Sequence, residues 1–365
     1  MDREQQILAI IRENPFISQL EMSAQLGISR SAVAGCIAAL TKRGVILGRA
    51  YITSEKQTVL CIGGANLDSK AIGKQKIRLA SSNPVTVQQS CGGVARNIAE
   101  NLANLTCSVS LLTVVGDDAE GRWVLEKTQK SGVDTSLAYR MPNEKTGAYT
   151  ALLDESGEMF LAFANMDIYD LLTPAMIQDK WSHIAAAKIV VADTNCSPTT
   201  LDYLIQRCNE ESLTLFIDPV SSEKSKRLPS RLDGVTAIFP NLEEACELAS
   251  ISVTEKPDYS RIADVIMQRG VKHVFITLGA LGVWYQGEEG THLFPPIPTE
   301  IVDVTGAGDA FVAGVVYGVL HHQTFIEACK LGLAAAHLTL QTAASVANQI
   351  NTVLLDQTIK ERLHS

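Results

Sequence analysis

The sequence lacks the patterns that mark membrane and secreted proteins. Its apolar runs stay well short of the roughly 20 residues that a membrane-spanning helix needs. The N-terminus, MDREQQILAI, begins with charged and polar residues and has no signal-peptide pattern. We therefore expect a cytoplasmic protein with no membrane partner.

Patterns for disulfides, structural metals and P-loops are missing too. The eight cysteines are scattered without a C-x-x-C pair, and the seven histidines show no H-E-x-x-H spacing. Such cysteines are typical of free thiols in a reducing compartment, so we expect no disulfide framework and no structural metal. The sequence has no G-x-x-x-x-G-K-[ST] segment, which excludes a P-loop kinase.

What is present indicates an ordinary globular protein with one large and one small domain. The chain has 365 residues, of which 46% are hydrophobic and 19% are charged. Residues 1–58 carry seven Lys/Arg and five Asp/Glu, whereas the remainder carries 24 and 35. This asymmetry argues against nucleic-acid binding by the acidic body and permits it for the N-terminal part.

Residues 1–54 have the pattern of a winged helix-turn-helix domain. Apolar residues recur at helical spacing over 3–13, and Ser18 can cap a second helix that Gly27 ends. Ser29 can cap a third helix over 30–43, and residues 45–53 can form a small hairpin or wing. The segment resembles the winged helix-turn-helix domains of bacterial transcription regulators. Residues 55–58 are the expected linker to a second domain over 59–365.

The third predicted helix is the candidate DNA-binding element. It contains Arg30, Lys42 and Arg43 and no acidic residue, as a helix that enters the major groove requires. Ser29, Arg30 and Ser31 stand at its leading end. One copy makes few phosphate contacts, so useful affinity needs a dimer or a larger assembly. The alternative is a small helical bundle that serves self-association.

Beyond residue 58, short apolar runs alternate with helical segments. This order predicts a doubly wound, mainly parallel sheet with helices on both faces. The predicted strands cover residues 59–64, 109–115, 188–192, 213–217, 237–239 and 274–278. Residues 146–153 and 158–165 alternate about a turn and predict a hairpin, which can form a small projecting sheet with residues 70–90.

Polar and glycine-rich clusters follow most of these predicted strands. They are Asn66 with Asp68, Gly116 with Asp117, Asn195, Asp218, Asn241 with Glu244, Gly279 with Gly282, and residues 306–309. Each cluster alone is also typical of turns and helix caps. Together they share the carboxyl edge of the predicted sheet, where ligands bind in such folds.

The segment DVTGAGDAF (303–311) is the centre of these clusters. It lies between a strand-like run over 299–302 and a helix-like run over 310–320. Glycines before a helix allow close backbone approach, and a helix N-terminus attracts phosphate. Asp309 would repel a phosphate there, unless its task is to take a proton from an attacking hydroxyl. The alternative interpretation is a capped helix start behind a turn.

Six segments in order resemble the ribokinase-like (PfkB) family of sugar and nucleoside kinases. They are GGANLDS (63–69), CGGVARNIAENLANL (91–105), VVGDDAEGR (114–122), PNLEEA (240–245), TLGALGVWY (277–285) and DVTGAGDAFVAGV (303–315). The resemblance covers nearly all of residues 59–345. It implies a ribokinase-like fold with a small β lid, built from residues of about 67–90 and 146–168, that excludes water and pairs two subunits in a homodimer.

The segments over 82–105 and 162–168 are most similar to those of pseudouridine kinases, although Asn165-Met166-Asp167 departs from the Asn-Asp-Met order common there. The resemblance therefore implies ATP-dependent phosphorylation of the 5′-hydroxyl of a nucleoside, with pseudouridine as the first candidate. Two alternatives remain. One is a sugar kinase, and the other is a DNA-binding regulator that uses the kinase fold as a ligand sensor.

The same resemblance implies a role for each cluster. Asp309 would be the base, and the backbone of Gly306, Ala307 and Gly308 would form the anion hole. The implied substrate-binding residues are Asn66, Asp68, Gly92, Gly93, Asn97, Asn165 and Asp167, and the implied nucleotide-binding residues are Asn241, Thr277, Gly279, Gly282, Thr305 and Asn348. Glu244 would hold Mg²⁺ through water, and Asp303 and Ser345 would bind a monovalent cation such as K⁺.

Overall fold

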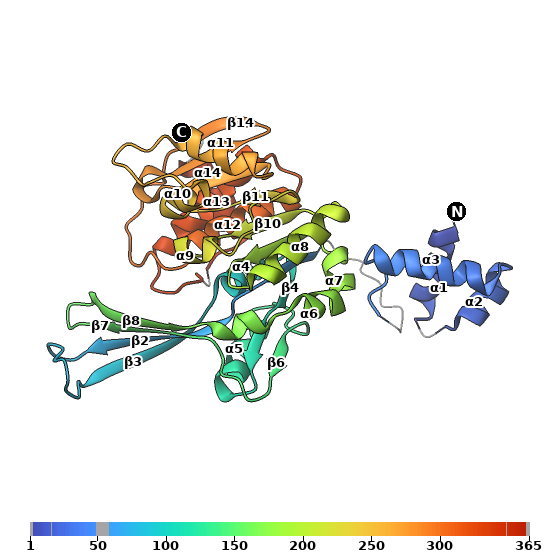
Figure 1. The fold of residues 1–365 in the computed structure, drawn as a ribbon, viewed down its shortest axis with the longest axis horizontal. Coiled ribbons are helices and arrows are strands. Elements are labelled where there is room, and N and C mark those ends of the chain that lie inside the picture. The colour runs from blue at the N-terminus through green and yellow to red at the C-terminus, as the bar shows by residue number, and fades with distance from the viewer. Residues whose placement is uncertain (1–2, 16, 49–57, 348, 363–365) are drawn as a thin grey trace.

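The computed structural model describes residues 3–15, 17–48, 58–347 and 349–362 (Figure 1). Its N-terminal part is the predicted three-helix unit, with α1 (Arg3–Glu13), α2 (Gln19–Leu26) and α3 (Arg30–Lys42). Ser18 and Glu21 form a capping box at the start of α2, and Gly27 ends that helix in the left-handed conformation. Residues 49–53 of the predicted wing and 55–57 of the predicted linker lie outside the described residues.

The large domain is built on an eight-stranded sheet. Its spatial order is β14 (Gly290–Phe294), β13 (Val283–Gly287), β12 (His273–Thr277), β11 (Val235–Ile238), β10 (Leu215–Asp218), β9 (Ile189–Asp193), β1 (Thr58–Ile62) and β4 (Ser108–Leu112). The strands from β12 to β4 pair in parallel, and β13 and β14 add an antiparallel edge. The predicted doubly wound, mainly parallel sheet is confirmed.

Helices cover both faces of this sheet. One face carries α4 (Val94–Asn104), α12 (Ala307–Leu320), α13 (Phe325–Leu340) and α14 (Thr352–Arg362). The other carries α6 (Pro174–Asp179), α7 (Trp181–Ala186), α8 (Pro198–Glu210), α10 (Leu242–Ala249) and α11 (Tyr259–Gln268). The remaining helical elements are α5 (Ala119–Lys130), α9 (Ser222–Ser225), η1 (Asp167–Leu171) and η2 (Gly279–Leu281). None of the described helices combines the length and apolar character that crossing a bilayer requires.

Strand β1 shows why its sequence is a continuous apolar run. Val59 and Cys61 pack into the core on the α12 face, whereas Leu60 and Ile62 pack into the core on the α8 face. Side chains alternate between the two faces of a strand, so both alternating sets must be apolar. Each fully buried aliphatic side chain stabilises the fold by about 1.5–3 kcal/mol. Together the two cores place the ends of β1, β9, β10 and β11 along one edge.

A second sheet projects from the body as a lid (Figure 1). Its order is β3 (Val85–Gly92), β2 (Asn66–Gly73), β7 (Ala148–Leu153) and β8 (Met159–Asn165). Strands β2 and β7 pair in parallel, and the two outer pairs are antiparallel. The predicted lid and its hairpin are confirmed, except that residues 167–168 already belong to η1, on the body.

One predicted strand is divided in two, and one run that was expected to be strand-like forms no strand. The run over 109–115 is split at Thr113, whose hydroxyl donates to the Gly63 carbonyl (2.6 Å); beyond it, β5 (Val114–Gly116) pairs with β6 (Tyr139–Met141) in a separate sheet. The run over 299–302 forms no strand. Its Val302 amide donates instead to the Leu340 carbonyl at the end of α13, and Ile301 and Val302 remain exposed. Apolar character alone did not distinguish a strand from the wall of a cavity.

Candidate active site

The edge at the ends of β1 and β9 is held together by Asp193. This buried carboxylate accepts hydrogen bonds from the amides of Gly64 (2.8 Å), Ala95 (3.0 Å) and Asn195 (2.9 Å). Gly63 has a φ of +145°, and a Cβ there would overlap the Asp193 carboxylate. Asp193 thus ties the loop after β1 to the start of α4. Asp193 is not among the predicted site residues, although an aspartate that ends an apolar strand is a recognisable signal.

The predicted substrate residues meet beside this junction. The Asn66 amide donates to Asp68 Oδ1 (2.6 Å), as expected for two residues on one face of a strand. A Cβ at Gly92 would overlap the Asp68 carboxylate, and Gly93 needs its φ of +101° to pass the Gly64 carbonyl. Burial raises the pKa of Asp68 to about 6, against the lowering effect of the Asn66 hydrogen bond. Gly92 is therefore required by close packing on Asp68, and Gly93 by close packing on the Gly64 backbone.

Asn97 and Asp309 lie far apart in sequence and are in direct contact. The Asn97 amide donates to Asp309 Oδ2 (2.8 Å). The other end of that amide, Oδ1, accepts from Arg96 Nη1 (3.0 Å), which fixes the orientation of the group. Arg96 is buried, and it also pairs with Glu100. The sequence analysis did not identify Arg96 as the residue that orients Asn97.

The environment of Asp309 shifts its titration toward neutral pH. Burial is the largest cause and raises the pKa of Asp309 to about 7; the charges of Asp193 and Asp68 add to the rise. The Asn97 hydrogen bond and the Arg96 charge act in the opposite direction. A carboxylate that gains a proton near pH 7 is suited to general-base catalysis.

The first turn of α12 presents backbone amides next to Asp309. Gly306 is the N-cap, with a φ of +80°, and a Cβ there would overlap the Ser345 carbonyl oxygen. The Ala307 amide donates to the Val304 carbonyl (3.3 Å). Within a helix the amides of Gly308 and Asp309 have no helical acceptor. Gly308 has open space around its Cα, so a ligand can approach this turn closely.

Asp303 orders the loop that leads into α12. Its Oδ1 accepts from the Thr305 amide (2.9 Å) and the Thr305 hydroxyl (2.6 Å), and its Oδ2 accepts from Lys70 Nζ (2.9 Å). Burial alone would raise the pKa of Asp303, but these hydrogen bonds outweigh it and lower the pKa. The carboxylate already has a cationic partner, which does not fit the expected binding of K⁺ by Asp303 and Ser345.

Asn241 and Glu244 lie together at the start of α10, where they form a capping box. The Asn241 amides donate to Glu244 (2.9 and 2.7 Å), and the Glu244 amide donates back to Asn241 Oδ1 (2.9 Å). Both line a cavity of about 170 Å³ that Asp218 and Asp309 also border. Burial, followed by the charges of Asp309 and Glu244, raises the pKa of Asp218 well above its usual range. Burial likewise raises the pKa of Glu244.

This set of carboxylates fits Mg²⁺ held through water. Mg²⁺ prefers oxygen ligands and keeps several of its waters. Among the described residues, no three His, Cys, Asp or Glu side chains stand close enough together to ligate a metal directly. Direct ligation by a protein cage is therefore not supported, whereas Glu244 and Asp218 can accept hydrogen bonds from metal-bound water in the cavity.

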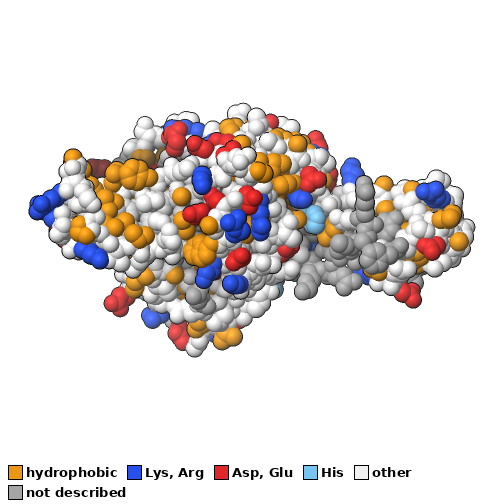
Figure 2. Space-filling view, turned by 90° about the horizontal axis from the view of Figure 1, so that it is seen from below, with side chains coloured by type: hydrophobic (Ala, Val, Ile, Leu, Met, Phe, Trp, Pro, Cys, Tyr) orange, Lys and Arg blue, Asp and Glu red, His pale blue; other side chains and the backbone are white. Residues whose placement is uncertain are grey.

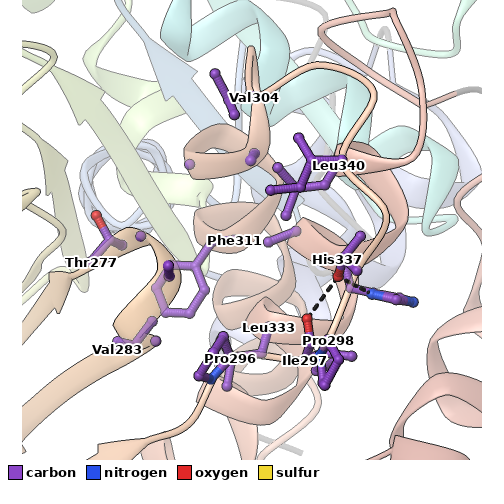
Figure 3. Close-up of a pocket in the computed structure, with 18 residues that line it drawn as sticks. Thr277, Val283, Pro296, Ile297, Pro298, Val304, Phe311, Leu333, His337 and Leu340 are labelled. Atoms are coloured by element: carbon purple, nitrogen blue, oxygen red, sulfur yellow. Dashed lines mark hydrogen bonds between the residues drawn. The ribbon is translucent and has the colours of Figure 1, made fainter.

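A larger cavity of about 510 Å³ adjoins the small one and shares Thr277, Gly308 and Phe311 with it (Figure 3). Gly279 and Gly282 line its rim, and the rest of its wall is mostly apolar, including Val283, Pro296, Leu333 and Leu340. Its lining includes Ala307 and Gly308 at the first turn of α12 and Leu333 and Leu340 on α13.

The polar side chains of this wall bind one another. The hydroxyl of Thr299 lies between His337 Nδ1 (2.6 Å) and the Ile297 carbonyl (2.7 Å). The hydroxyl has one proton and donates it to the carbonyl, so His337 Nδ1 carries the proton of the other bond. Burial lowers the pKa of His337, which favours this neutral form. The far nitrogen then accepts from Gln341 (3.2 Å).

The remaining predicted residues are less tightly placed. Asn165 is the last residue of β8 and pairs with Ala148 on β7. Ala148 in turn pairs with Leu67 on β2, and Leu67 stands between Asn66 and Asp68 in that strand. Asp167 begins η1, and both side chains are exposed. Thr305 lies beside Asp303, and Ser345 contacts Gly306 through its backbone. Asn348 lies outside the described residues.

The predicted DNA-binding residues stand together at the start of α3. Ser29 is the N-cap, because its hydroxyl accepts from the Ala32 amide (3.2 Å). Its hydroxyl also lies 2.9 Å from that of Ser31. Arg30 and Ser31 are exposed. The helix start is therefore capped internally, and its Arg30 side chain is available for a partner.

Comparison with known proteins agrees with this geometry. The chain matches the family model "pfkB family carbohydrate kinase" over residues 56–351 and a winged helix-turn-helix DNA-binding model over residues 2–46. It is 32% identical over 339 residues to an uncharacterized sugar kinase, YeiI, of Escherichia coli, covering 93% of each chain. It is 33% identical over 308 residues to the pseudouridine kinase of the same organism, covering 82% of this chain and 97% of the relative.

Among solved structures, a putative sugar kinase from Clostridium perfringens superposes with a TM-score of 0.75 at 27% identity. That match covers 84% of this chain and 97% of the other. The family match spans well over half of the chain, and it includes every residue of the crevice described above. The chain belongs to the pfkB family of carbohydrate kinases, and it carries a winged helix-turn-helix region at its N-terminus.

Proposed function

We propose that this protein transfers the γ-phosphoryl group of ATP to the 5′-hydroxyl of a nucleoside, namely pseudouridine, and releases pseudouridine 5′-phosphate and ADP. The observation that carries the proposal is the environment of Asp309. A partly buried carboxylate with its pKa raised to about 7 is held by Asn97 at the first turn of a helix. A base and an anion site side by side are what phosphoryl transfer to an alcohol needs.

In this mechanism Asp309 accepts the proton of the substrate 5′-hydroxyl while the hydroxyl oxygen, O5′, attacks the γ-phosphorus. The new O5′–P bond forms as the bond from the γ-phosphorus to the bridging oxygen breaks, and that oxygen leaves on ADP. The amides of Gly308 and Asp309 stabilise the charge on the transferring group. Mg²⁺, when bound near Glu244, would neutralise charge on the β- and γ-phosphates.

The residues proposed to bind the phosphoryl acceptor favour a ribosyl group as substrate. Asn66 and Asp68 together offer acceptors and a donor for a pair of sugar hydroxyls. Asp167, at the start of η1, is the proposed reader of the base, because pairing with Ala148 and Leu67 puts Asn165 on the lid face opposite Asp68. The identity of 33% to a pseudouridine kinase favours pseudouridine over other nucleosides. A sugar kinase is the second candidate, since the relative YeiI is described as a sugar kinase.

A substrate panel tests this proposal. Purified protein with Mg-ATP is offered pseudouridine, uridine, other nucleosides, ribose and fructose, and both ADP and the phosphorylated product are measured. We expect the highest kcat/KM with pseudouridine. Faster phosphorylation of a free sugar would establish the sugar-kinase alternative. Phosphorylation of none of them would contradict the kinase function and favour a ligand-sensing regulator.

We further propose that the N-terminal domain, residues 1–54, binds DNA. The match to a winged helix-turn-helix model and the exposed Arg30 on a capped α3 support this role. Arg30→Ala should weaken binding to a DNA site selected from a random pool, whereas Arg122→Ala, on the body, should not. Equal binding by both variants would contradict the role of α3. Deletion of residues 1–54 should leave kinase activity intact.

The lid surface that faces away from the body is suited to pairing two subunits. Strand alternation puts Val87, Leu161 and Phe163 on one face of the lid sheet, opposite the face that carries Asp68 and Lys70. Leu161 is 46% exposed and Phe163 60% exposed. Figure 2 shows apolar side chains gathered on the left of the molecule, where the lid projects. We propose that this face is buried in a homodimer, which sedimentation of a Phe163→Asp variant would test.

A further inference from the structure

Strand β2 carries three polar residues on the face that looks toward the body. Asn66, Asp68 and Lys70 alternate along the strand, so they share that face. Asn66 and Asp68 bind each other beside the sugar site. Lys70 lies two residues further out on the lid, and its ammonium reaches Asp303 on the body, 233 positions away in sequence (2.9 Å). Neither the sequence analysis nor the proposed mechanism gives Lys70 a role.

This contact joins the lid to the loop over residues 303–306, which leads into α12 and is called the phosphoryl-transfer loop below. Among the ion pairs of the described residues, Lys70–Asp303 alone connects a strand of the lid to the body. Asp303 also binds Thr305, the residue before Gly306. Lys70 is thus linked through one carboxylate to the backbone that begins α12.

A negative charge at Asp303 is a problem for the proposed reaction. The carboxylate lies in the loop that leads into an anion site, where it would repel the phosphates of a nucleotide. A cation on Asp303 removes that repulsion. Lys70 provides such a cation within the chain. Its ammonium donates to Asp303 Oδ2, whereas the Thr305 hydroxyl donates to Oδ1.

We propose that Lys70 is a positioning residue that supplies the positive charge on Asp303 and holds the loop before α12 in place when the lid covers the acceptor. The proposal rests on the proposed kinase function. It implies that the protein needs no monovalent metal cation for phosphoryl transfer, because the lysine ammonium takes the place of that ion. It also makes the ordering of the phosphoryl-transfer loop depend on the position of the lid.

The test compares wild type, Lys70→Met, Lys70→Arg and the control Lys76→Met, which removes another exposed lysine of the lid region. Each is measured in potassium chloride and in choline chloride at equal ionic strength. Wild type and Lys76→Met should have the same kcat, within about twofold, in both salts. Lys70→Met should lose about tenfold or more of kcat in choline and recover part of it in potassium, since the charge left on Asp303 then repels the phosphates unless a metal cation neutralises it. Lys70→Arg should retain most activity.

Binding of ATP by calorimetry in the same two salts supplies a second readout. Lys70→Met should bind ATP more weakly than wild type in choline, with potassium restoring the affinity. A lysine that only helps the lid to fold would not produce this salt dependence. The proposal is overturned if wild type needs potassium for activity or for ATP binding, or if Lys70→Met matches wild type in both salts. Wild type could bind ATP equally in both salts, and Lys70→Met only in potassium, while no acceptor is phosphorylated. That result would contradict the proposed function and leave the role of Lys70 at Asp303 supported.

Discussion

The two sides of the crevice are built in different ways. On the acceptor side, buried polar groups hold one another through short contacts, as in the bonds of Asp193 to Gly64 and of Asn97 to Asp309. On the nucleotide side, a wide and mostly apolar cavity leaves Thr299 and His337 bound to each other. The comparison indicates polar control of charge and proton position on the proposed acceptor side, and for the proposed nucleotide side it favours binding by shape and by apolar burial. Substitutions on the two sides should therefore affect kcat and KM differently.

The largest effect is expected at Asp309. Asp309→Asn keeps the size of the side chain and its contact with Asn97 but removes the proton acceptor. Loss of a general base costs about 10²–10⁴-fold in kcat, so turnover should fall by that order while ATP binding stays near its wild-type value. Asp356→Asn, an exposed carboxylate on α14, is the control. Equal turnover in Asp309→Asn and wild type would show that the acceptor side does not supply the base.

The next largest effect is a difference in stability between alanine variants of Gly306 and Gly308, the two glycines of the proposed anion site. Gly306→Ala places a Cβ against the Ser345 carbonyl and forces a φ of +80° on a residue that disfavours it. We expect a loss of about 1–3 kcal/mol in stability together with most of the activity. Gly308→Ala meets no neighbour and should unfold at the wild-type temperature.

Thermal unfolding followed by circular dichroism measures this difference. Identical melting temperatures for Gly306→Ala and Gly308→Ala would contradict the packing of Gly306 on Ser345. Activity of Gly308→Ala is a separate readout, because a methyl group there obstructs the approach of a phosphate without disturbing the fold.

A smaller effect with a distinct signature is expected at Asn97. Its hydrogen bond lowers the pKa of Asp309, so Asn97→Ala should raise that pKa further. The base would then stay protonated to higher pH, and the acid limb of kcat/KM should move upward. We expect a several-fold loss of kcat/KM at neutral pH, because a larger fraction of Asp309 is then protonated. Asn101→Ala, one turn later on α4, is the control, and an equal shift in both variants would contradict the direct contact.

The smallest effect is expected on the nucleotide side. Leu340→Ala removes apolar surface from the cavity wall and should raise KM for ATP by about tenfold or less, with kcat nearly unchanged. Val353→Ala, an exposed apolar residue on α14, is the control. A fall in kcat without a change in KM would break the distinction between the two sides.

Local patterns in the sequence predicted the fold and most of the crevice. Ser18 and Ser29 were recognisable as capping residues, and the apolar runs that end in Asn, Asp or Gly marked the strand ends. Clusters share one sheet edge because the strands are parallel, and alternation of strands and helices predicts parallel strands. These features depend on a few neighbouring residues, so they can be read from a single sequence.

Contacts between distant segments could not be predicted in the same way. Asp193, Arg96 and Lys70 act through partners on other elements, and no local pattern shows which partner each one meets. The strand break at Thr113 is of the same kind, since it depends on the carbonyl of Gly63. The shift in the pKa of Asp309 also arises from burial and from charges on separate elements.

The central claim is that Asp309 is the base and that its surroundings bring its pKa near 7. The most direct measurement is the pH dependence of kcat/KM for the acceptor at saturating ATP. Because the base works only when deprotonated, activity should rise with pH through one ionisation near pH 7 and then level off, and this ionisation should be missing from the residual activity of Asp309→Asn. A profile that is flat from about pH 5 to 8, or an ionisation near 7 that survives in Asp309→Asn, would contradict the account.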